Sequence, residues 1–303
     1  MKNHCNICNS KNLIFKTYDR HVLDFSLKGV LKVMLPNFNF LIPNYFSKIK
    51  DISSRKKNGF KGKISVCQDC GYGVMVNIPS LIQLEEYYTN DYWDGYRQIK
   101  PPVFKNKYKK NQRGVTQSDF VLPFLNKMSE KKINILEIGA GGAWAVLNLR
   151  DRLSYDVVSL NVCEPGDKWK NYYKQAKINR VSNFFPFKNS KKYHYIHTSH
   201  WLEHVKNLNN TIDSLYEMLE TGGKLFIEVP NTEHYYWNLP VSDTPHIHFF
   251  TIKSLNKVFE KAGFKCLKSG EFGITFQDLN NGLAPIHEQN DKGSYIRAIY
   301  IKI

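Results

Sequence analysis

The sequence contains no apolar run of the roughly 20 residues that a membrane-spanning helix needs. Its first ten residues are polar and include two cysteines, so they do not resemble a secretory signal peptide. These two absences predict a cytoplasmic protein. Its six cysteines are therefore expected to be reduced rather than paired in a disulfide framework.

Acidic residues are few relative to basic ones. The sequence has 27 Asp and Glu and 43 Lys and Arg, which gives a formal net charge of +16 at pH 7. The basic excess lies mainly in the first 114 residues, with clusters at 55–57 and 105–110. Such clusters can contact phosphates or an anionic membrane surface, but they also occur as solvated faces of Lys-rich proteins. Because no nucleic-acid-binding motif accompanies the charge, we expect no nucleic-acid partner. An anionic substrate and a peripheral membrane contact stay open as alternatives.

Four of the cysteines form two Cys-x-x-Cys pairs, Cys5 with Cys8 and Cys67 with Cys70. Two such pairs can supply four thiolates to a tetrahedral zinc ion, and the metal can stabilise a segment with little core of its own. The alternative is four reduced cysteines without a metal. The spacing favours a zinc-binding module over 1–80, with a long insertion between the two pairs, 9–66, that is expected to pack as core or lid.

The stretch 81–114 is expected to act as a linker or lid. A helix is predicted over 79–88, with Ser80 positioned to cap it. The residues that follow, 90–108, are rich in Tyr, Trp and Lys and contain two adjacent prolines, which indicates a loop.

The rest of the chain, 115–303, is organised around the stretch KINILEIGAGGAW, residues 132–144. An apolar run of strand length leads into a glycine-rich turn, after which helical spacing resumes. Glycine permits backbone angles closed to other residues and lets a cofactor approach bare backbone at a helix N-terminus. A second apolar run, 157–162, ends near Glu164, where a βαβ unit receives the hydroxyls of a bound ribose. An NAD site would need a third glycine at the position of Trp144.

Strand and helix patterns alternate through this part of the chain. Short apolar runs predict further strands over 180–183, 193–198, 224–229, 264–268 and 295–303, and a strand over 71–77 in the front part. Helical spacing predicts helices over 118–127, 168–176, 208–219 and 254–262, the last closed by Gly263. This alternation predicts an α/β fold with a doubly wound, mostly parallel sheet, whose ligand crevice lies at the carboxyl ends of the strands.

Four stretches in this order resemble the motifs of class I S-adenosylmethionine (SAM) methyltransferases: LEIGAGGA, CEPG, SHWLEHV and LETGGKLFIEVPN. In the last motif Glu220 and Thr221 replace the usual Lys and Pro. The two Cys-x-x-Cys pairs ahead of them are similar to those of the zinc-carrying methyltransferases found in sugar and surface-polysaccharide gene clusters. The resemblance implies a Rossmann-like seven-stranded methyltransferase sheet behind a small zinc module. The sequence lacks the extra C-terminal domain of sugar C-methyltransferases, so methylation of carbon is not expected.

The resemblance also implies which residues contact SAM. Glu137 would neutralise the amino group, Glu164 would accept both ribose hydroxyls, and Asn183 would bind the adenine amino group. The full set is Glu137, Gly139, Ala140, Gly141, Glu164, Asn183 and His200.

Methyl transfer from a sulfonium is an in-line displacement, and a hydroxyl acceptor must also lose its proton. Catalytic candidates at the mouth of the crevice are Glu203, His204, His246 and His248. His246 and His248 alternate like strand residues, so one of them is expected to face the site, and this pair is favoured slightly over His204 as the base. Glu203 and His204 can instead be scaffold that holds the edge of the cofactor. They also resemble the metal-holding cluster of ubiquinone-type O-methyltransferases, although His200 replaces the first carboxylate of that cluster.

The sequence therefore predicts a SAM-dependent methyltransferase that acts on a hydroxyl of a sugar, nucleotide sugar or surface glycan, in polysaccharide biosynthesis. One alternative is a nucleic-acid or membrane-surface binding protein with a degenerate SAM-type fold. Another is a metal-assisted O-methyltransferase of small molecules.

Overall fold

A computed structural model of the chain describes residues 4–19, 61–96, 111–126, 132–153, 156–188, 191–232, 246–275, 289 and 291–303. Most of the insertion expected over 9–66 lies outside these ranges, as do the Lys-rich cluster at 55–57 and all of the cluster at 105–110. Within the described ranges, no helix is both long enough and apolar enough to cross a membrane.

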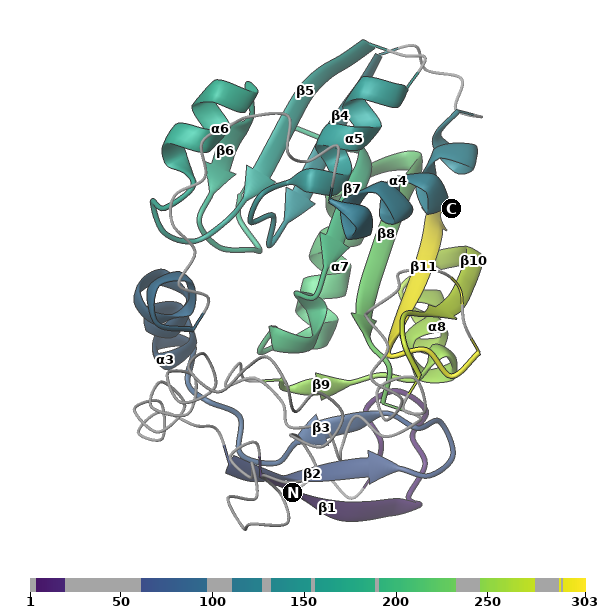
Figure 1. Ribbon diagram of the computed structural model, residues 1–303. Coiled ribbons are helices and arrows are strands. Elements are labelled where there is room, and N and C mark those ends of the chain that lie inside the picture. The colour runs from purple at the N-terminus through teal and green to yellow at the C-terminus, as the bar shows by residue number, and fades with distance from the viewer. Residues whose placement is uncertain are drawn as a thin grey trace, which may run out of the picture.

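The main element of the fold is a seven-stranded sheet with the order β10-β11-β8-β7-β4-β5-β6 (Figure 1). The strands β8, β7, β4, β5 and β6 run parallel, and β11 runs antiparallel between β8 and β10. Their bounds are β4 Lys132–Ile138, β5 Asp156–Cys163, β6 Asn179–Ser182, β7 Tyr193–Ser199, β8 Leu219–Pro230, β10 Phe264–Phe272 and β11 Tyr295–Lys302. This arrangement confirms the mostly parallel α/β sheet that the sequence predicts.

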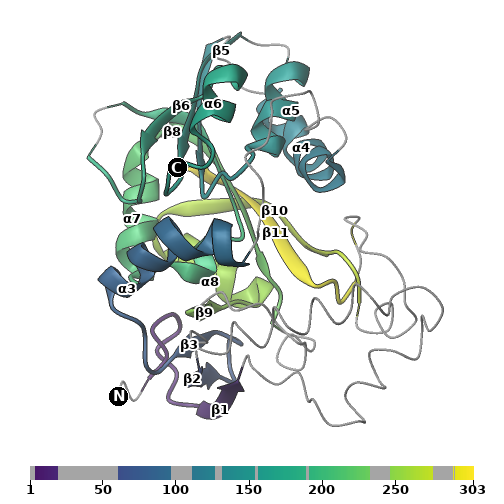
Figure 2. The same cartoon turned by 60° about the vertical axis from the view of Figure 1, so that its left-hand side comes forward.

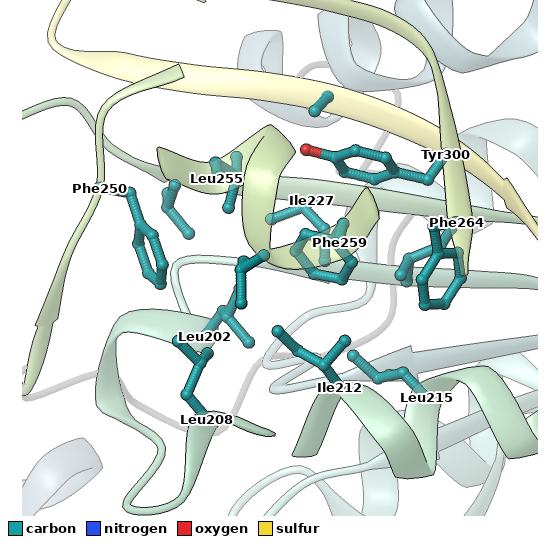
Figure 3. Packing of buried hydrophobic residues seen from close by; sticks show 14 of the residues in the cluster. Leu202, Leu208, Ile212, Leu215, Ile227, Phe250, Leu255, Phe259, Phe264 and Tyr300 are labelled. Carbon is teal, nitrogen blue, oxygen red and sulfur yellow. The ribbon is translucent and has the colours of Figure 1, made fainter. Parts of the chain in front are cut away.

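Helices cover both faces of this sheet, and their bounds are α4 Gln112–Leu125, α5 Trp144–Arg152, α6 Lys170–Ala176, α7 Leu208–Met218 and α8 Ile252–Lys261. Residues of α4, α5 and α6 share one buried cluster with Ile133 and Ile135 of β4. Residues of α7 and α8 share the other with Leu136 and Ile138. Figure 3 shows this second core, where α7 faces Phe259 of α8. Because neighbouring strand residues point to opposite faces, β4 contributes to both cores.

A four-stranded antiparallel sheet forms the N-terminal module, in the order β1-β2-β3-β9. Its strands are β1 Leu13–Asp19, β2 Lys61–Cys67, β3 Gly73–Met75 and β9 His248–Phe249. The sequence did not predict β1 or β2, and β3 is shorter than the expected strand 71–77. The strand β9 follows β8 in the chain, so the large domain supplies the last strand of the small sheet.

The helix α3 Leu81–Glu86 begins at the expected cap, because the Ser80 hydroxyl accepts from the backbone N–H of Gln83 in a full capping box. The chain then continues as a π-helix, Tyr87–Tyr96, where the sequence predicted a loop from residue 90. Ring contacts of Tyr88 with Tyr87 and Tyr92, at centroid distances of 5.1 and 5.4 Å, hold this helix together. In both views α3 lies at the level between the two sheets (Figure 2).

The helix α4 begins at Gln112, earlier than the helix expected over 118–127 and inside the stretch 81–114 that was expected to be a linker. The side chain of Asn111 accepts from the backbone N–H of Gly114 over 2.8 Å and caps the helix. The domain boundary expected at residue 115 therefore falls within α4. The sequence reasoning did not identify Asn111 as the N-cap of this helix.

Candidate active site

The glycine turn between β4 and α5 has the geometry that its sequence predicts. Gly139 and Gly141 adopt positive φ angles of 68° and 48°. A Cβ atom on Gly139 would lie only 3.0 Å from the side chain of Trp201. The turn therefore needs glycine at this position for its size as well as for its φ angle. The backbone N–H of Gly139 donates to the carbonyl of Cys163 over 2.9 Å, which joins the turn to the end of β5.

A cavity of about 990 Å³ lies at the carboxyl ends of β4, β5 and β7 and extends to the N-terminal module. Its lining contains all seven residues that the sequence assigned to the cofactor, namely Glu137, Gly139, Ala140, Gly141, Glu164, Asn183 and His200. At the far end it is lined by residues of the module and of α3 and the π-helix, among them Asn6, Phe15, Leu81 and Tyr92. One cavity thus connects the cofactor turn to the small sheet.

Two buried carboxylates lie at the cofactor end of the cavity. Glu164 accepts the backbone N–H of Gly141 at Oε2 over 3.0 Å. Glu137 is 5% exposed, and its Oε2 has no hydrogen-bond partner among the described residues. Burial and the neighbouring Glu164 raise the pKa of Glu137 well above its usual value. Its other oxygen lies 3.9 Å from Nε2 of His197, whose pKa burial lowers to about 3, so that this imidazole is neutral.

These groups fit SAM. A buried carboxylate without a partner calls for a cation, which the amino group of SAM can supply. The carboxylate of Glu164, which accepts from the Gly141 N–H, is the type of group that accepts from ribose hydroxyls. Beyond Asn183, the ring of Phe185 packs edge-on against Trp201 at a centroid distance of 5.6 Å, and both side chains line the cavity. An aromatic wall of this kind suits a planar base.

The structure adds Arg113 of α4, a cavity residue that the sequence reasoning missed. Its Nε donates to Oε1 of Glu228 over 2.8 Å, and its guanidinium also contacts Nε2 of His200. Glu228, at the end of β8, accepts a second bond from Nε of Arg297 over 2.7 Å. Burial alone would raise the pKa of Glu228, but the two arginines lower it far below its usual value. No local pattern marks Arg113, because its partner lies 115 residues away in the sequence.

Glu203, His204 and His246 form a compact cluster on the wall of the cavity. Glu203 and His204 belong to the short 3-10 helix η4 Leu202–His204, which follows β7. His204 lines the cavity, and the centroid of its ring lies 4.7 Å from the ring centroid of His246. One potential ligand atom from each of the three residues lies within 4.8 Å of the others. The structure therefore brings three of the four catalytic candidates together.

The fourth candidate, His248, has a different environment. Its Nε2 lies 2.8 Å from the carbonyl oxygen of Val205 and must donate to it, so Nδ1 accepts from the hydroxyl of Tyr72 over 2.6 Å. The ring is 4% exposed, and burial is the main cause that lowers its pKa to about 4. Both nitrogens are thus occupied. Of the two histidines expected to alternate, His248 lines the cavity and His246 does not. The hydrogen bonds of His248 nevertheless join β9 to Tyr72, just before β3, and to Val205, just after η4, and leave neither ring nitrogen open to act as a base.

The four cysteines of the two Cys-x-x-Cys pairs meet at one point. Sγ of Cys5 lies 3.7 Å from Sγ of Cys70, and Sγ of Cys8 lies 3.5 Å from Sγ of Cys67. All four sulfur atoms lie within 4.8 Å of one another, and none forms a disulfide. Thiolates at about 2.3 Å from a tetrahedral zinc are about 3.8 Å apart, so the four side chains fit such an ion.

Comparisons with known proteins bear on the family and on the fold. A family model described as a methyltransferase domain matches residues 108–269. The structure of 1,6-didemethyltoxoflavin-N1-methyltransferase from Burkholderia thailandensis is 12% identical, covers 76% of this chain and 95% of that chain, and has a TM-score of 0.52. The magnesium protoporphyrin IX methyltransferase of Synechocystis PCC 6803 is 12% identical, covers 74% of this chain and 100% of that chain, and has a TM-score of 0.50. At this identity the two structures indicate a shared fold alone. No curated protein sequence matches the chain.

Proposed function

The chain belongs to the methyltransferase-domain family and is a SAM-dependent methyltransferase, and from this premise we propose that it methylates a hydroxyl of a sugar, nucleotide sugar or surface glycan. The observation that carries the cofactor assignment is the buried carboxylate of Glu137, whose Oε2 has no hydrogen-bond partner among the described residues. It borders the same cavity as the glycine turn.

Each polar group at the cofactor end has a separate task in this proposal. Bound SAM supplies an electrophilic methyl group on a sulfonium. Glu137 holds the amino group of the cofactor, and Glu164 accepts the ribose hydroxyls. Arg113, fixed by the buried Glu228, binds the carboxylate, because a guanidinium is the natural partner of that group. Asn183 takes the adenine amino group.

The far end of the cavity supports a carbohydrate acceptor. Tyr88 and Tyr92 border it, and their rings offer flat apolar faces to the C–H faces of a sugar. Asn209 and Asn210 of α7 line the same cavity, and their amides can both donate and accept hydrogen bonds. Lys206 adds a cation that suits the phosphates of a nucleotide sugar.

The proton of the acceptor hydroxyl is lost at the cluster of Glu203, His204 and His246. His204 borders the cavity, and its Nε2 lies 3.5 Å from the buried carboxylate of Glu203. The negative charge of this carboxylate attracts positive charge that develops beside it. The cluster can therefore stabilise the charge that develops as the proton leaves.

We also propose that the four cysteines bind a structural zinc ion. Cys5 and its neighbours Asn6 and Ile7 line the far end of the cavity. The hydroxyl of Thr251, at the start of α8, donates to the carbonyl of Cys70 over 2.8 Å. The metal would thus hold one wall of the acceptor site against the large domain.

Two measurements test the proposed function. Calorimetric titration with SAM should show one binding site per chain. Incubation with radiolabelled SAM and a panel of nucleotide sugars and oligosaccharides should transfer label to at least one compound of this class. Transfer only to acceptors without a sugar hydroxyl would contradict the acceptor assignment. A complete lack of SAM binding would favour the alternative of a degenerate fold that binds a surface.

A further inference from the structure

We propose that Glu203, His204 and His246 bind a divalent transition-metal ion in the wall of the active-site cavity. The inference rests on the proposed function only for the task of the ion, which is to hold the acceptor hydroxyl. The binding of the ion depends on the three side chains themselves. Two imidazoles and one carboxylate suit zinc or cobalt better than calcium or magnesium, which prefer oxygen ligands throughout.

The three ligand atoms are already close together. One atom from each residue lies within 4.8 Å of the other two. An ion bound at about 2.1 Å from each ligand atom would hold them about 3.4 Å apart in a tetrahedral site. Closure onto an ion therefore needs side-chain shifts of only about an ångström, which rotation about χ angles can supply.

The carboxylate of Glu203 is the strongest indication of a missing cation. The residue is 1% exposed, and neither of its oxygens has a hydrogen-bond partner among the described residues. Its Oε1 lies 3.4 Å from Nδ1 of His200 and 3.5 Å from Nε2 of His204, distances too long for a good hydrogen bond. A buried ionised carboxylate is costly unless a charge or a set of donors compensates it. An ion bound by Glu203, His204 and His246 would supply that charge.

The loops that carry the ligands are held in place. The backbone N–H of Ile247 donates to the carbonyl of Glu203 over 2.7 Å, which holds His246 next to η4. On the other side of Ile247, His248 bonds to Tyr72 and to the carbonyl of Val205. A ligand set held by the backbone and by neighbouring side chains loses little entropy when the ion binds.

The site has an opening on the side of the acceptor. The side chain of His204 is 11% exposed and borders the cavity, whereas Glu203 and His246 lie deeper. Three protein ligands and one open position are typical of catalytic rather than structural zinc sites. The acceptor hydroxyl would bind at the open position, where the ion lowers its pKa. The hydroxyl proton passes to water, the new O–C bond forms as the S–C bond breaks, and SAM leaves as S-adenosylhomocysteine.

The test is a titration of the full-length protein with Co²⁺, followed by calorimetry and absorption spectroscopy without SAM or acceptor. Cobalt bound by the four cysteines gives an intense thiolate charge-transfer band, and cobalt bound by histidine and carboxylate does not. We expect one equivalent to bind without this band. Glu203→Gln and His246→Ala should each weaken this binding by about 100-fold or more, because each removes a direct ligand.

Glu137→Gln is the matched control, because it neutralises another buried carboxylate of the same cavity. It should leave Co²⁺ binding unchanged and weaken SAM binding, whereas Glu203→Gln should do the reverse. Retained SAM binding in Glu203→Gln also demonstrates that this variant folds. Wild-type protein that binds Co²⁺ only with the thiolate band, or a Glu203→Gln variant that binds it as tightly as wild type, would overturn the site. If wild type fails to bind SAM, the proposed function is contradicted, but the conclusion about the metal site still follows from the Co²⁺ titration.

Discussion

Arg113 at the start of α4 donates from Nε to Oε1 of Glu228 at the end of β8, over 2.8 Å and across 115 residues of sequence. Glu228 is fully buried and also binds Arg297, so the carboxylate holds Arg113 in one orientation at the edge of the cavity. The contact places a fixed positive charge where the carboxylate of SAM is proposed to bind.

Arg113→Gln should therefore weaken SAM binding by about 1.5–3 kcal/mol, the size of a lost charge-assisted hydrogen bond. The sharper readout is a comparison with decarboxylated SAM, which lacks the group that Arg113 binds. Wild type should prefer SAM over this analogue, and the variant should lose most of the preference. Arg152→Gln, on a half-exposed arginine of α5 paired with Asp119, is the control and should behave like wild type. An unchanged preference in Arg113→Gln would remove this residue from the carboxylate site.

Glu164→Ala removes two proposed hydrogen bonds to the ribose and should lower SAM affinity by about 2–4 kcal/mol, measured by calorimetry. The protein should still fold, because the sheet does not depend on this side chain. Glu220→Ala, on an exposed residue of β8, serves as the control. If Glu164→Ala binds SAM as wild type does, the carboxylate does not contact the cofactor.

SAM affinity should depend on pH through Glu137. Burial and Glu164 raise the pKa of Glu137, so lowering the pH through that raised value protonates the carboxylate and removes its attraction for the amino group of SAM. Affinity should then fall by up to about tenfold for each pH unit below the pKa. The nearby His197 does not titrate in this range, because its pKa is about 3, and Tyr195 stays neutral, because burial raises its pKa well above the usual value.

The control for this pH dependence is Glu137→Gln, which has no proton to gain. Calorimetry from pH 5 to pH 8 should give a flat and weaker profile for the variant and a rising one for wild type. Two parallel profiles would mean that another group causes the dependence.

The double variant Cys67→Ser, Cys70→Ser should lose bound zinc and destabilise the small sheet, because thiolate zinc contributes directly to folding. Since β9 pairs with β3, amide hydrogen exchange should increase in His248–Phe249 as well as in the module itself. Cys266→Ser, outside the cluster, should change neither property. Elemental analysis of wild type, purified without chelator, that finds less than half an equivalent of zinc would rule out the structural ion.

The histidines should separate into two classes. His204→Ala and His246→Ala should lower kcat by about 100-fold with SAM affinity nearly unchanged, because both belong to the cluster at which the acceptor hydroxyl is proposed to lose its proton. His248→Ala should act through stability, with a loss of about 1–3 kcal/mol for the unpaired Tyr72 hydroxyl and Val205 carbonyl. Thermal unfolding measured beside turnover distinguishes the two. Variants of His204 and His246 that each keep more than half of wild-type turnover would show that methyl transfer here proceeds by alignment alone.

The seven strands of the large sheet and the cofactor turn were predictable, because apolar periodicity and glycine placement are local properties. The strands β1 and β2 were not, since a long insertion separates the two strands that pair, although Ile64 and Val66 of β2 alternate with the polar Lys63 and Ser65. The π-helix was missed because ring contacts of Tyr88, with Tyr87 and Tyr92 in the helix and with His204 of η4, hold it rather than helix propensity. The sequence does not predict that His246 lies beside Glu203 and His204. A backbone hydrogen bond from Ile247 to Glu203 holds it there, and the two residues are far apart in the sequence.

The crossing of β9 into the small sheet limits how this protein can be divided or recombined. A fragment that begins at residue 115 would keep β9 but lose β3, its hydrogen-bonded neighbour, and would present an unpaired strand edge. The N-terminal module is therefore not a cassette that could be exchanged between homologous enzymes by a single crossover. A functional chimaera must carry residues 246–250 together with the two cysteine knuckles, from the same parent.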